Sequence, residues 1–363
     1  MEIRLDRTEL LRELVPMQGI VERRTTIPVL SHLLLRAQDD QLSIAATDLE
    51  VSLTSSCDGE IQEEGEIAVQ AKKLLEIMRA ADGDSVTLRI DNDGVLTILV
   101  GQSIFKIRGL PADDFPTLPE VEADPTSIPF ETFRSMIGKV FFAISSEESR
   151  FQLSGALLEI SDDSLILVAT DGHRLALVES EADGISEADG VLVPRKALQE
   201  LQRFDGGEMI FRRSEHHLSF TVGRRQLICR ILEGTFPDYE RVISQDNDKI
   251  VLSDRKHLQG VIQRVSLLTG DRSRAVRLEL AEGSLIFSAA NPDLGEARED
   301  VACEYSGDGL SMGLNPDYLL QFLGATDTEK VRFELKDESS QCVCYPVDGG
   351  EKRYVCVVMP IRL

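Results

Sequence analysis

A short sequence unit recurs three times along this chain at nearly equal spacing. Each copy is an apolar strand that ends in a small residue followed by Asp or Asn, which are residue types suited to a turn. The copies are Leu42–Asp48, Leu165–Asp171 and Leu285–Asn291, and their last residues are separated by 123 and 120 residues. A repeat at a fixed period constrains the whole fold, because every copy is expected to build the same local structure.

Two further landmarks recur with the same period. A short amphipathic helix is predicted to start at Ala71, Pro194 and Asn315, and proline suits a helix start because its missing N–H is not needed there. Lys73, Lys196 and Asp317 occupy matching places in these helices. A strand is predicted to close each unit, over 105–110, 228–232 and 354–359. Three independent landmarks therefore support the repeat.

Apolar residues at helical spacing also predict a helix that opens each unit. They are Leu10, Leu11, Leu14 and Val15 in the first unit, Phe133, Met136, Ile137, Val140 and Phe141 in the second, and Leu258, Val261, Ile262 and Val265 in the third. Alternating runs such as 86–90 and 218–222 predict antiparallel strands between the helices. We therefore predict an α+β fold with three domains, at 1–122, 123–246 and 247–363. Similar units that meet in the same way form either a closed ring or an open array.

Composition limits the possible functions. The 363 residues carry a formal net charge of -24, so their summed field repels a polyanion, although a local basic patch is still possible. No apolar run is long enough for a membrane helix, and the N-terminus does not resemble a secretory signal, so we expect a cytoplasmic protein without a membrane partner. The six cysteines form no CxxC pair and the five histidines are dispersed. We therefore expect neither a metal nor a cofactor.

Many of the basic residues fall on the predicted helices. They are Arg7, Arg12, Arg134, Lys139, Arg255, Lys256 and Arg264 on the opening helices, and Lys72, Lys73, Arg79, Arg195, Lys196 and Arg203 on the second helices. The second helix of the third unit has no cation, and several glutamates dilute the pattern. Two interpretations stay open: an ordinary solvated helix face, or a basic helical lining in an otherwise acidic protein.

Several motifs together resemble one family. They are 169–176 (ATDGHRLA), 236–242 (FPDYERV), 110–116 (LPADDFP), 193–196 (VPRK), 47–50 (TDLE), 24–30 (RTTIPVL) and the terminal 357–363 (VVMPIRL). Their order over the whole chain is similar to that of the bacterial DNA polymerase III beta subunits, the sliding clamps. The sequence departs from the family pattern at Phe151 and Gln152, where an aromatic pair is usual, and at Cys356, where Tyr is usual.

The resemblance implies three tandem repeats of the DNA-clamp fold, with helices inside and antiparallel sheets outside, which close into a ring as a head-to-tail homodimer. Such a ring encircles duplex DNA without reading its sequence and holds the replicative polymerase on its template. The implied partners are duplex DNA, the polymerase catalytic subunit, the clamp loader, and other replication and repair proteins that carry short clamp-binding peptides. A basic lining would attract phosphates, and an acidic exterior would repel DNA that is not threaded.

The resemblance also implies three sets of site residues. The partner-peptide pocket matches Leu153, Thr170, Gly172, His173, Arg174, Leu175, Pro237, Arg241, Val242, Asn315, Tyr318, Val357, Met359, Pro360 and Arg362. The DNA-binding residues match Arg24, Lys73, Arg150 and Lys196. The dimer interface matches Phe105 and Ile107 in the first domain and Leu267 and Leu268 in the third.

Two other functions are alternatives to a sliding clamp. An enzyme could use His173 as a general base beside Asp171, but general acid–base work needs a positioned partner and a substrate pocket. The chain carries no nucleophile motif, phosphate-binding loop or metal-ligand cluster. The turns equivalent to Asp171 also lack the histidine. We therefore expect no catalytic residues. The other alternative is a scaffold that binds peptides but not DNA.

Overall fold

The fold is described from a computed structural model that covers residues 1–22, 25–91, 93–147, 149–161, 163–181, 188–270 and 274–362. The chain forms two compact units. The first unit comprises Met1–Glu131 and Lys196–Ile231, and the second comprises Thr132–Arg195 and Leu232–Leu363.

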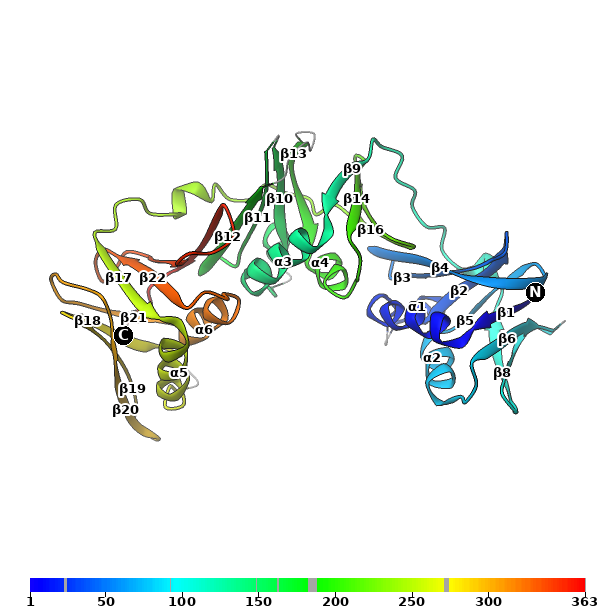
Figure 1. Cartoon of the computed structure of the whole chain (residues 1–363), viewed down its shortest axis with the longest axis horizontal. Coiled ribbons are helices and arrows are strands. Elements are labelled where there is room, and N and C mark those ends of the chain that lie inside the picture. The colour runs from blue at the N-terminus through cyan, green and yellow to red at the C-terminus, as the bar shows by residue number, and fades with distance from the viewer. Residues whose placement is uncertain are drawn as a thin grey trace. The chain divides into compact units, whose positions relative to one another are not determined.

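The first unit contains a twelve-stranded antiparallel sheet in the order β1-β6-β7-β8-β5-β2-β3-β4-β16-β15-β14-β9 (Figure 1). Its strands are β1 (Glu2–Asp6), β2 (His32–Gln38), β3 (Gln41–Thr47), β4 (Val51–Glu63), β5 (Gly65–Gln70), β6 (Ser85–Ile90), β7 (Val95–Val100), β8 (Ser103–Leu110), β9 (Thr126–Pro129), β14 (Glu208–Arg213), β15 (His217–Val222) and β16 (Arg225–Arg230). Strand β4 pairs with β16 from Val51 to Thr54. This pairing, called the first junction below, joins the first sequence repeat to the second.

Two helices pack side by side against this sheet, α1 (Arg7–Ile20) and α2 (Ala71–Ala80) (Figure 1). Leu10 and Leu14 of α1 and Leu74, Leu75 and Met78 of α2 are fully buried, as the helical spacing of these residues predicts. The carboxylate of Asp6 accepts a hydrogen bond from the backbone N–H of Glu9 at 2.8 Å and so caps α1. Helix α4 (Arg195–Leu201) begins at the boundary of the unit.

The second unit contains an eight-stranded antiparallel sheet in the order β13-β10-β11-β12-β24-β23-β22-β17 and a four-stranded sheet in the order β20-β19-β18-β21. The strands are β10 (Gly155–Ser161), β11 (Ser164–Thr170), β12 (Arg174–Glu181), β13 (Ala188–Pro194), β17 (Lys249–Asp254), β18 (Val276–Ala281), β19 (Ser284–Asn291), β20 (Gly295–Ala302), β21 (Leu310–Leu314), β22 (Lys330–Leu335), β23 (Cys342–Pro346) and β24 (Arg353–Val358). Strand β12 pairs with β24, and this second junction joins the second repeat to the third.

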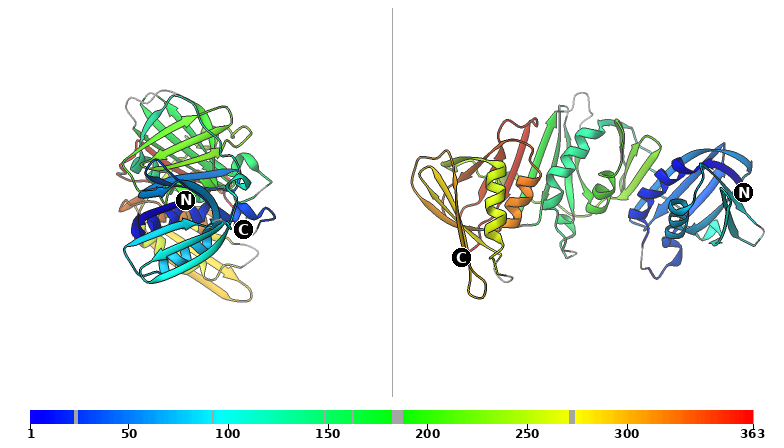
Figure 2. Two further views of the ribbon diagram at one scale, coloured as in Figure 1. Left: turned by 90° about the vertical axis from the view of Figure 1, so that its right-hand side faces the viewer. Right: turned by 60° about the horizontal axis from the view of Figure 1, so that its bottom comes forward.

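Helices α5 (Arg255–Ser266) and α6 (Pro316–Gly324) lie side by side in this unit (Figure 2). Helix α3 (Phe130–Val140) crosses the division between the units. Asp254 caps α5 and Asn315 caps α6, and Pro316 occupies the first turn of α6. Short 3₁₀ helices are η1 (Pro28–Ser31), η2 (Ala112–Asp114), η3 (Phe141–Ala143), η4 (Phe151–Leu153) and η5 (Glu240–Val242).

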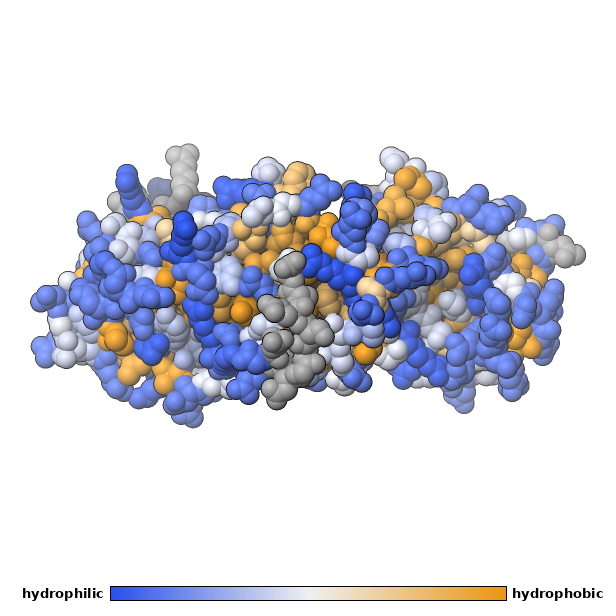
Figure 3. Space-filling model, turned by 90° about the horizontal axis from the view of Figure 1, so that it is seen from above, coloured by the Kyte–Doolittle hydropathy of each residue, from blue (hydrophilic) through white to orange (hydrophobic). Residues whose placement is uncertain are grey.

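The structure confirms the predicted helices and strands of all three repeats, with differences at their ends: the closing strand expected at 228–232 ends at Arg230, and Phe141 lies in η3. Val15, which the spacing places on the apolar face of α1, is 45% exposed. The three copies of the recurrent strand are β3, β11 and β19, and the closing strands are β8, β16 and β24. All six cysteines are free thiols, and burial raises the pKa of Cys344 and Cys356 in the sheet of the second unit. Polar side chains cover most of the face seen in Figure 3, with apolar patches between them. No helix in the described part of the chain is long and apolar enough to cross a membrane.

Candidate functional site

The turn that follows β11 is held by its own polar side chains. Asp171 Oδ1 accepts hydrogen bonds from the backbone N–H groups of His173 at 2.9 Å and Arg174 at 3.0 Å. Thr170 Oγ1 accepts from the N–H of Gly172 at 3.1 Å and donates to the carbonyl of Arg174 at 2.6 Å. Gly172 has φ +88°, a conformation that favours glycine. These bonds explain why an Asp follows the strand at this position.

The Arg174 side chain connects this turn to two other segments, helix α6 and the 3₁₀ helix η3. Its Nε lies 3.1 Å from Asp171 Oδ2, and both side chains are largely buried, at 10% and 17% exposure. Its two terminal nitrogens donate to Gln321 of α6 and to the carbonyl of Phe142. The guanidinium also lies 4.2 Å from the ring centre of Tyr318, within the range of a cation–π contact. Arg174 therefore joins the second repeat to the third.

An apolar surface follows the second junction. Leu175 lies opposite Val357, and Leu177 lies opposite Val355, in the β12–β24 pair. These four residues belong to a buried cluster against which Val242 and Tyr239 pack with partial exposure. The backbone N–H of Met359 donates to the carbonyl of His173 at 2.9 Å, so the chain after β24 lies against the turn.

The structure brings most of the predicted pocket residues into this region of the second unit, but it uses them in different ways. Leu153, Thr170, Leu175 and Val357 are buried, whereas Gly172, His173, Pro237, Arg241, Met359 and Arg362 are exposed. Asn315 is occupied as the cap of α6, since its Oδ1 accepts from the N–H of Asp317 at 2.9 Å. Arg174, Val242, Tyr318 and Pro360 are half-buried. The set thus combines buried, mostly apolar residues with exposed residues that are both polar and apolar.

The electrostatics of the turn favour binding over acid–base chemistry. Both carboxylate oxygens of Asp171 already bind backbone N–H groups or Arg174, and His173 is exposed. Burial, together with the nearby Asp171, raises the pKa of Tyr318, and burial raises the pKa of Tyr239. Both phenols are therefore neutral hydrogen-bonding groups near pH 7. Among the described residues, no three His, Cys, Asp or Glu side chains are grouped so that they could hold a metal ion.

The predicted DNA-binding residues are not equally available. Arg24 lies outside the described residues. Lys73 is 55% exposed and pairs with Glu76 on its own helix at 2.7 Å. Arg150 donates to the carbonyl of Asp171 at 3.1 Å and pairs with Glu147 at 3.3 Å. Lys196 is ion-paired with Asp48 and donates to the carbonyl of Ile20 at 3.0 Å.

Two of the cations on the opening helices are used inside the fold. Arg7 donates to the carbonyls of Gly83 at 2.6 Å and Met78 at 2.9 Å. Arg255, at the equivalent place in the third repeat, donates to the carbonyls of Thr328 and Leu323. Each of these arginines joins the opening helix of its repeat to the end of the second helix. A basic residue on a helix is thus an uncertain sign of a charged surface.

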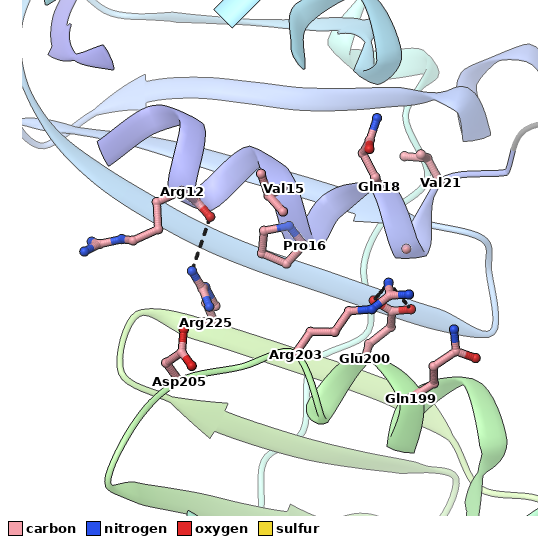
Figure 4. Close-up of a pocket in the computed structure, with 11 residues that line it drawn as sticks. Arg12, Val15, Pro16, Gln18, Val21, Gln199, Glu200, Arg203, Asp205 and Arg225 are labelled. Carbon is pink, nitrogen blue, oxygen red and sulfur yellow. Dashed lines mark hydrogen bonds and ion pairs between the residues drawn. The ribbon is translucent and has the colours of Figure 1, made fainter. Parts of the chain in front are cut away.

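A cleft of about 650 Å³ lies between α1 and α4 in the first unit (Figure 4). Glu13, only 4% exposed, binds Arg225 at 2.7 and 3.1 Å, Ser55 at 2.7 Å and Arg12 at 3.0 Å. Burial alone would raise the pKa of Glu13, but the hydrogen bonds from Arg225 and Ser55 outweigh it, and the pKa is lowered. Burial raises the pKa of Glu200, whose carboxylate binds Arg203 (Figure 4). Glu13, which contacts Arg12 and Arg225 of the cleft, and Glu200, which lines the cleft and pairs with Arg203, compensate the charge of these arginines.

The predicted interface residues lie beside two incompletely paired strands. Phe105 and Ile107 are half-buried on β8, which pairs fully with β7 but meets β5 only at Gly109 and Leu110. Leu267 is 76% exposed just after α5, and Leu268 is half-buried. Strand β20, which packs near α5, is an edge strand of the four-stranded sheet.

Sequence reasoning did not identify Phe142, Gln321, Glu13 or Arg225 as functional partners. Glu13 could have been suspected, because a carboxylate at this position interrupts the apolar face of α1. Phe142 contributes a backbone carbonyl, which no side-chain pattern reveals. The partners of Arg174 lie in segments far apart along the chain, so they become visible only in the folded structure.

Comparisons with known proteins agree with this architecture. Family models match in three consecutive parts: the DNA polymerase III beta subunit N-terminal domain at residues 1–119, its central domain at 127–238 and its C-terminal domain at 240–362. A beta sliding clamp of Pseudomonas aeruginosa is 39% identical over 373 residues and covers 100% of both chains. The similarity therefore extends over the full length of both chains.

Solved structures give the same result. The crystal structure of DNA polymerase III subunit beta from Pseudomonas aeruginosa has a TM-score of 0.94 at 39% identity, with 100% of each chain covered. The sliding clamp of Bartonella birtlesii, solved with griselimycin bound, has a TM-score of 0.94 at 34% identity, again with 100% of each chain covered. The chain therefore belongs to the DNA polymerase III beta subunit family, the bacterial beta sliding clamps.

Proposed function

We propose that two copies of this chain close head to tail into a ring around duplex DNA. As a member of the sliding-clamp family the chain is a non-catalytic processivity factor with DNA and polymerase as its partners. We further propose the domain limits 1–122, 123–246 and 247–363, and a location in the cytoplasm, where replication takes place.

The observation that carries the ring proposal is a pair of open sheet edges with complementary chemistry. Strand β8 has exposed Lys106 and Arg108, and β20 has exposed Glu296 and Asp300, whereas the exposed Arg298 of β20 is paired with Glu279. Large exposed apolar side chains accompany them, with Ile104 at 66% and Leu267 at 76% exposure. An unpaired edge of this kind is a template for pairing with another chain. Two different edges on one chain give a head-to-tail contact, which closes into a ring when the rotation allows.

Light scattering tests this interface. We expect the protein to have about twice the chain mass of 40.3 kDa. Leu267→Asp should give monomers, because it puts a charge into the proposed apolar contact. Leu49→Asp is the matched control, since Leu49 is 56% exposed in the turn between β3 and β4, neither of which neighbours β8 in the sheet, and it should remain dimeric. A monomeric parent protein at micromolar concentration, or a dimeric Leu267→Asp variant, would contradict the proposal.

We also propose that the apolar surface at the second junction captures short peptides of the polymerase, the clamp loader and other repair proteins. The proposed pocket consists of the residues that the sequence analysis assigns to the partner-peptide pocket, the first of which is Leu153 and the last Arg362. The first junction provides a natural comparison, since Ser52 and Thr54 occupy the places of Leu175 and Leu177. Ser52 is hydrogen-bonded to Thr47 at 2.9 Å. On this face Ser52 lies opposite Ile228 and Thr54 opposite Gln226, so the first junction lacks the aliphatic pairs that form the proposed peptide floor at the second junction.

Deleting residues 358–363 tests the pocket, because this segment includes Met359, Pro360 and Arg362. A fluorescent peptide carrying the clamp-binding segment of the polymerase should lose its affinity for the truncated protein, whereas the truncated protein should remain a dimer. Full peptide binding by the truncated protein would exclude this pocket. If the truncated protein stays dimeric, its loss of peptide binding is caused by loss of the pocket and not by loss of the fold.

For the DNA-facing surface we propose Arg24 and Lys73 as phosphate contacts. Lys73 is exposed on α2, and its ion-pair partner Glu76 is exposed too, so the pair is easily exchanged for a phosphate. Arg150 has internal partners and is proposed as a weaker contact. Such contacts do not recognise a base sequence, and they weaken as the salt concentration rises.

A further inference from the structure

The two junctions each contain a cation that binds the turn carboxylate and a backbone carbonyl close to the end of the opening helix. At the second junction, Arg174 binds the turn carboxylate of Asp171 and the carbonyl of Phe142, just after α3. At the first junction, Lys196 binds the turn carboxylate of Asp48 and the carbonyl of Ile20, at the end of α1. Asp48 and Asp171 are equivalent by the sequence repeat. The cation comes from the turn in one case and from the following helix in the other.

The turns themselves have matching internal bonds. Asp48 Oδ1 accepts from the backbone N–H groups of Glu50 at 2.9 Å and Val51 at 2.7 Å, as Asp171 Oδ1 does from His173 and Arg174. Position 51, equivalent to Arg174, is a buried valine that cannot supply a cation. Lys196 supplies it instead, from α4 of the next repeat. The same polar arrangement therefore exists at both junctions with a different donor.

We infer that Lys196 is a positioning residue that joins the first repeat to the second, and that it is not a DNA-phosphate contact. Asp48 is half-buried, and its side chain is only 9% exposed, so its charge depends on this ammonium group for compensation. Two of the three N–H groups of Lys196 already have acceptors in the fold. Removing Lys196 should loosen the turn and the end of α1 together.

Lys73 provides a matched control from the same chain. It occupies the equivalent place on the second helix of the first repeat, and it pairs with an exposed glutamate on its own helix. The variants to compare are Lys196→Met, Lys73→Met, Asp48→Asn and the double variant of Lys196 and Asp48. Asp48→Asn keeps the oxygen that binds the backbone and removes the charge. Lys196→Arg tests rescue, since an arginine performs this role at the second junction.

Amide hydrogen exchange on the full-length protein measures the effect. Lys196→Met should lower the protection of the Glu50 and Val51 amides by about tenfold, because a hydrogen bond to a charged group is lost. Lys73→Met should leave it unchanged, and Lys196→Arg should restore it. Lys196→Met and Asp48→Asn should be non-additive, as expected for direct partners. Unchanged protection in Lys196→Met, or additive effects, would overturn the inference.

A second measurement separates this role from DNA binding. The slope of log affinity for a duplex against log salt should fall by about one in Lys73→Met and stay at the parent value in Lys196→Met. A fall in Lys196→Met would overturn the inference. The exchange experiment contains no DNA, so its outcome is independent of the proposed ring.

Discussion

Arg174 and Arg241 are a matched pair of arginines whose removal is expected to affect stability to different extents. Each arginine forms an ion pair with an aspartate three residues earlier, at 3.1 Å for Arg174 and 2.7 Å for Arg241. The first pair is 10% and 17% exposed, and the second is 85% and 58% exposed. Both arginines belong to the predicted peptide pocket. They differ in burial, and Arg174 also contacts Gln321, the Phe142 carbonyl and Tyr318.

Arg174→Met should therefore destabilise the second unit far more than Arg241→Met. Removing one partner of a buried pair costs about 3 kcal/mol or more, and the contact with Tyr318 adds on the order of 1 kcal/mol. These contributions are not additive, so we expect a loss of about 3 kcal/mol. The exposed pair of Arg241 should contribute less than about 1 kcal/mol.

Urea unfolding at pH 7, followed by the fluorescence of a label placed in the second unit, measures the difference. Peptide affinity measured in parallel should also fall more in Arg174→Met, because Tyr318 and the turn lose a common support. Equal midpoints for the two variants would refute the reasoning that burial decides the strength of these pairs.

Three further predictions concern the junctions. Glu13→Gln should lower the free energy of unfolding in urea by about 3 kcal/mol at pH 7. Because the pKa of Glu13 is lowered in the folded protein, its carboxylate stabilises the fold above its ordinary pKa of about 4.5, and this stabilisation is lost as the pH falls below that value. The parent and the variant should therefore become equally stable in acid. Gly19→Ala should destabilise the protein although alanine favours helices, because the added Cβ would clash with the buried carboxylate of Glu200, which is paired with Arg203. In a Glu200→Ala background the same change should instead stabilise by about 0.5–1 kcal/mol relative to Glu200→Ala alone, and a stabilising Gly19→Ala single variant would exclude this close contact. Val357→Ser should weaken peptide capture at least tenfold in a fluorescence titration while the protein stays dimeric, whereas Ile228→Ser at the polar first junction should leave capture unchanged; equal loss in both would refute the assignment.

Periodicity and repetition were enough to predict the local structure of this chain. Leu74, Leu75 and Met78 are buried because their spacing places them on one side of α2, and such spacing is visible in the sequence. The Asp at the end of β3 and β11 was likewise recognisable, since its hydrogen bonds are to amides two and three residues away. Structure that depends on residues close together in the chain can therefore be predicted from the sequence.

The use of the charged side chains was not predictable in this way. Arg7 and Arg255 were grouped with Lys73 as helix-face cations, yet they donate to carbonyls at the ends of neighbouring helices. A helical pattern gives the direction of a side chain around its own helix and does not give the position of a second helix end. Lys196 illustrates the same limit, because its partner Asp48 belongs to the preceding repeat.

The central claim is that the protein holds DNA by encircling it. The most direct measurement is the release of clamp loaded onto a closed circular duplex, before and after a restriction enzyme cuts that duplex once. A ring should stay on the closed circle and leave the linear DNA by sliding off its ends, with little dependence on sequence. Equal retention on closed and linear DNA would contradict the account, because a protein bound only by surface contacts cannot distinguish the two.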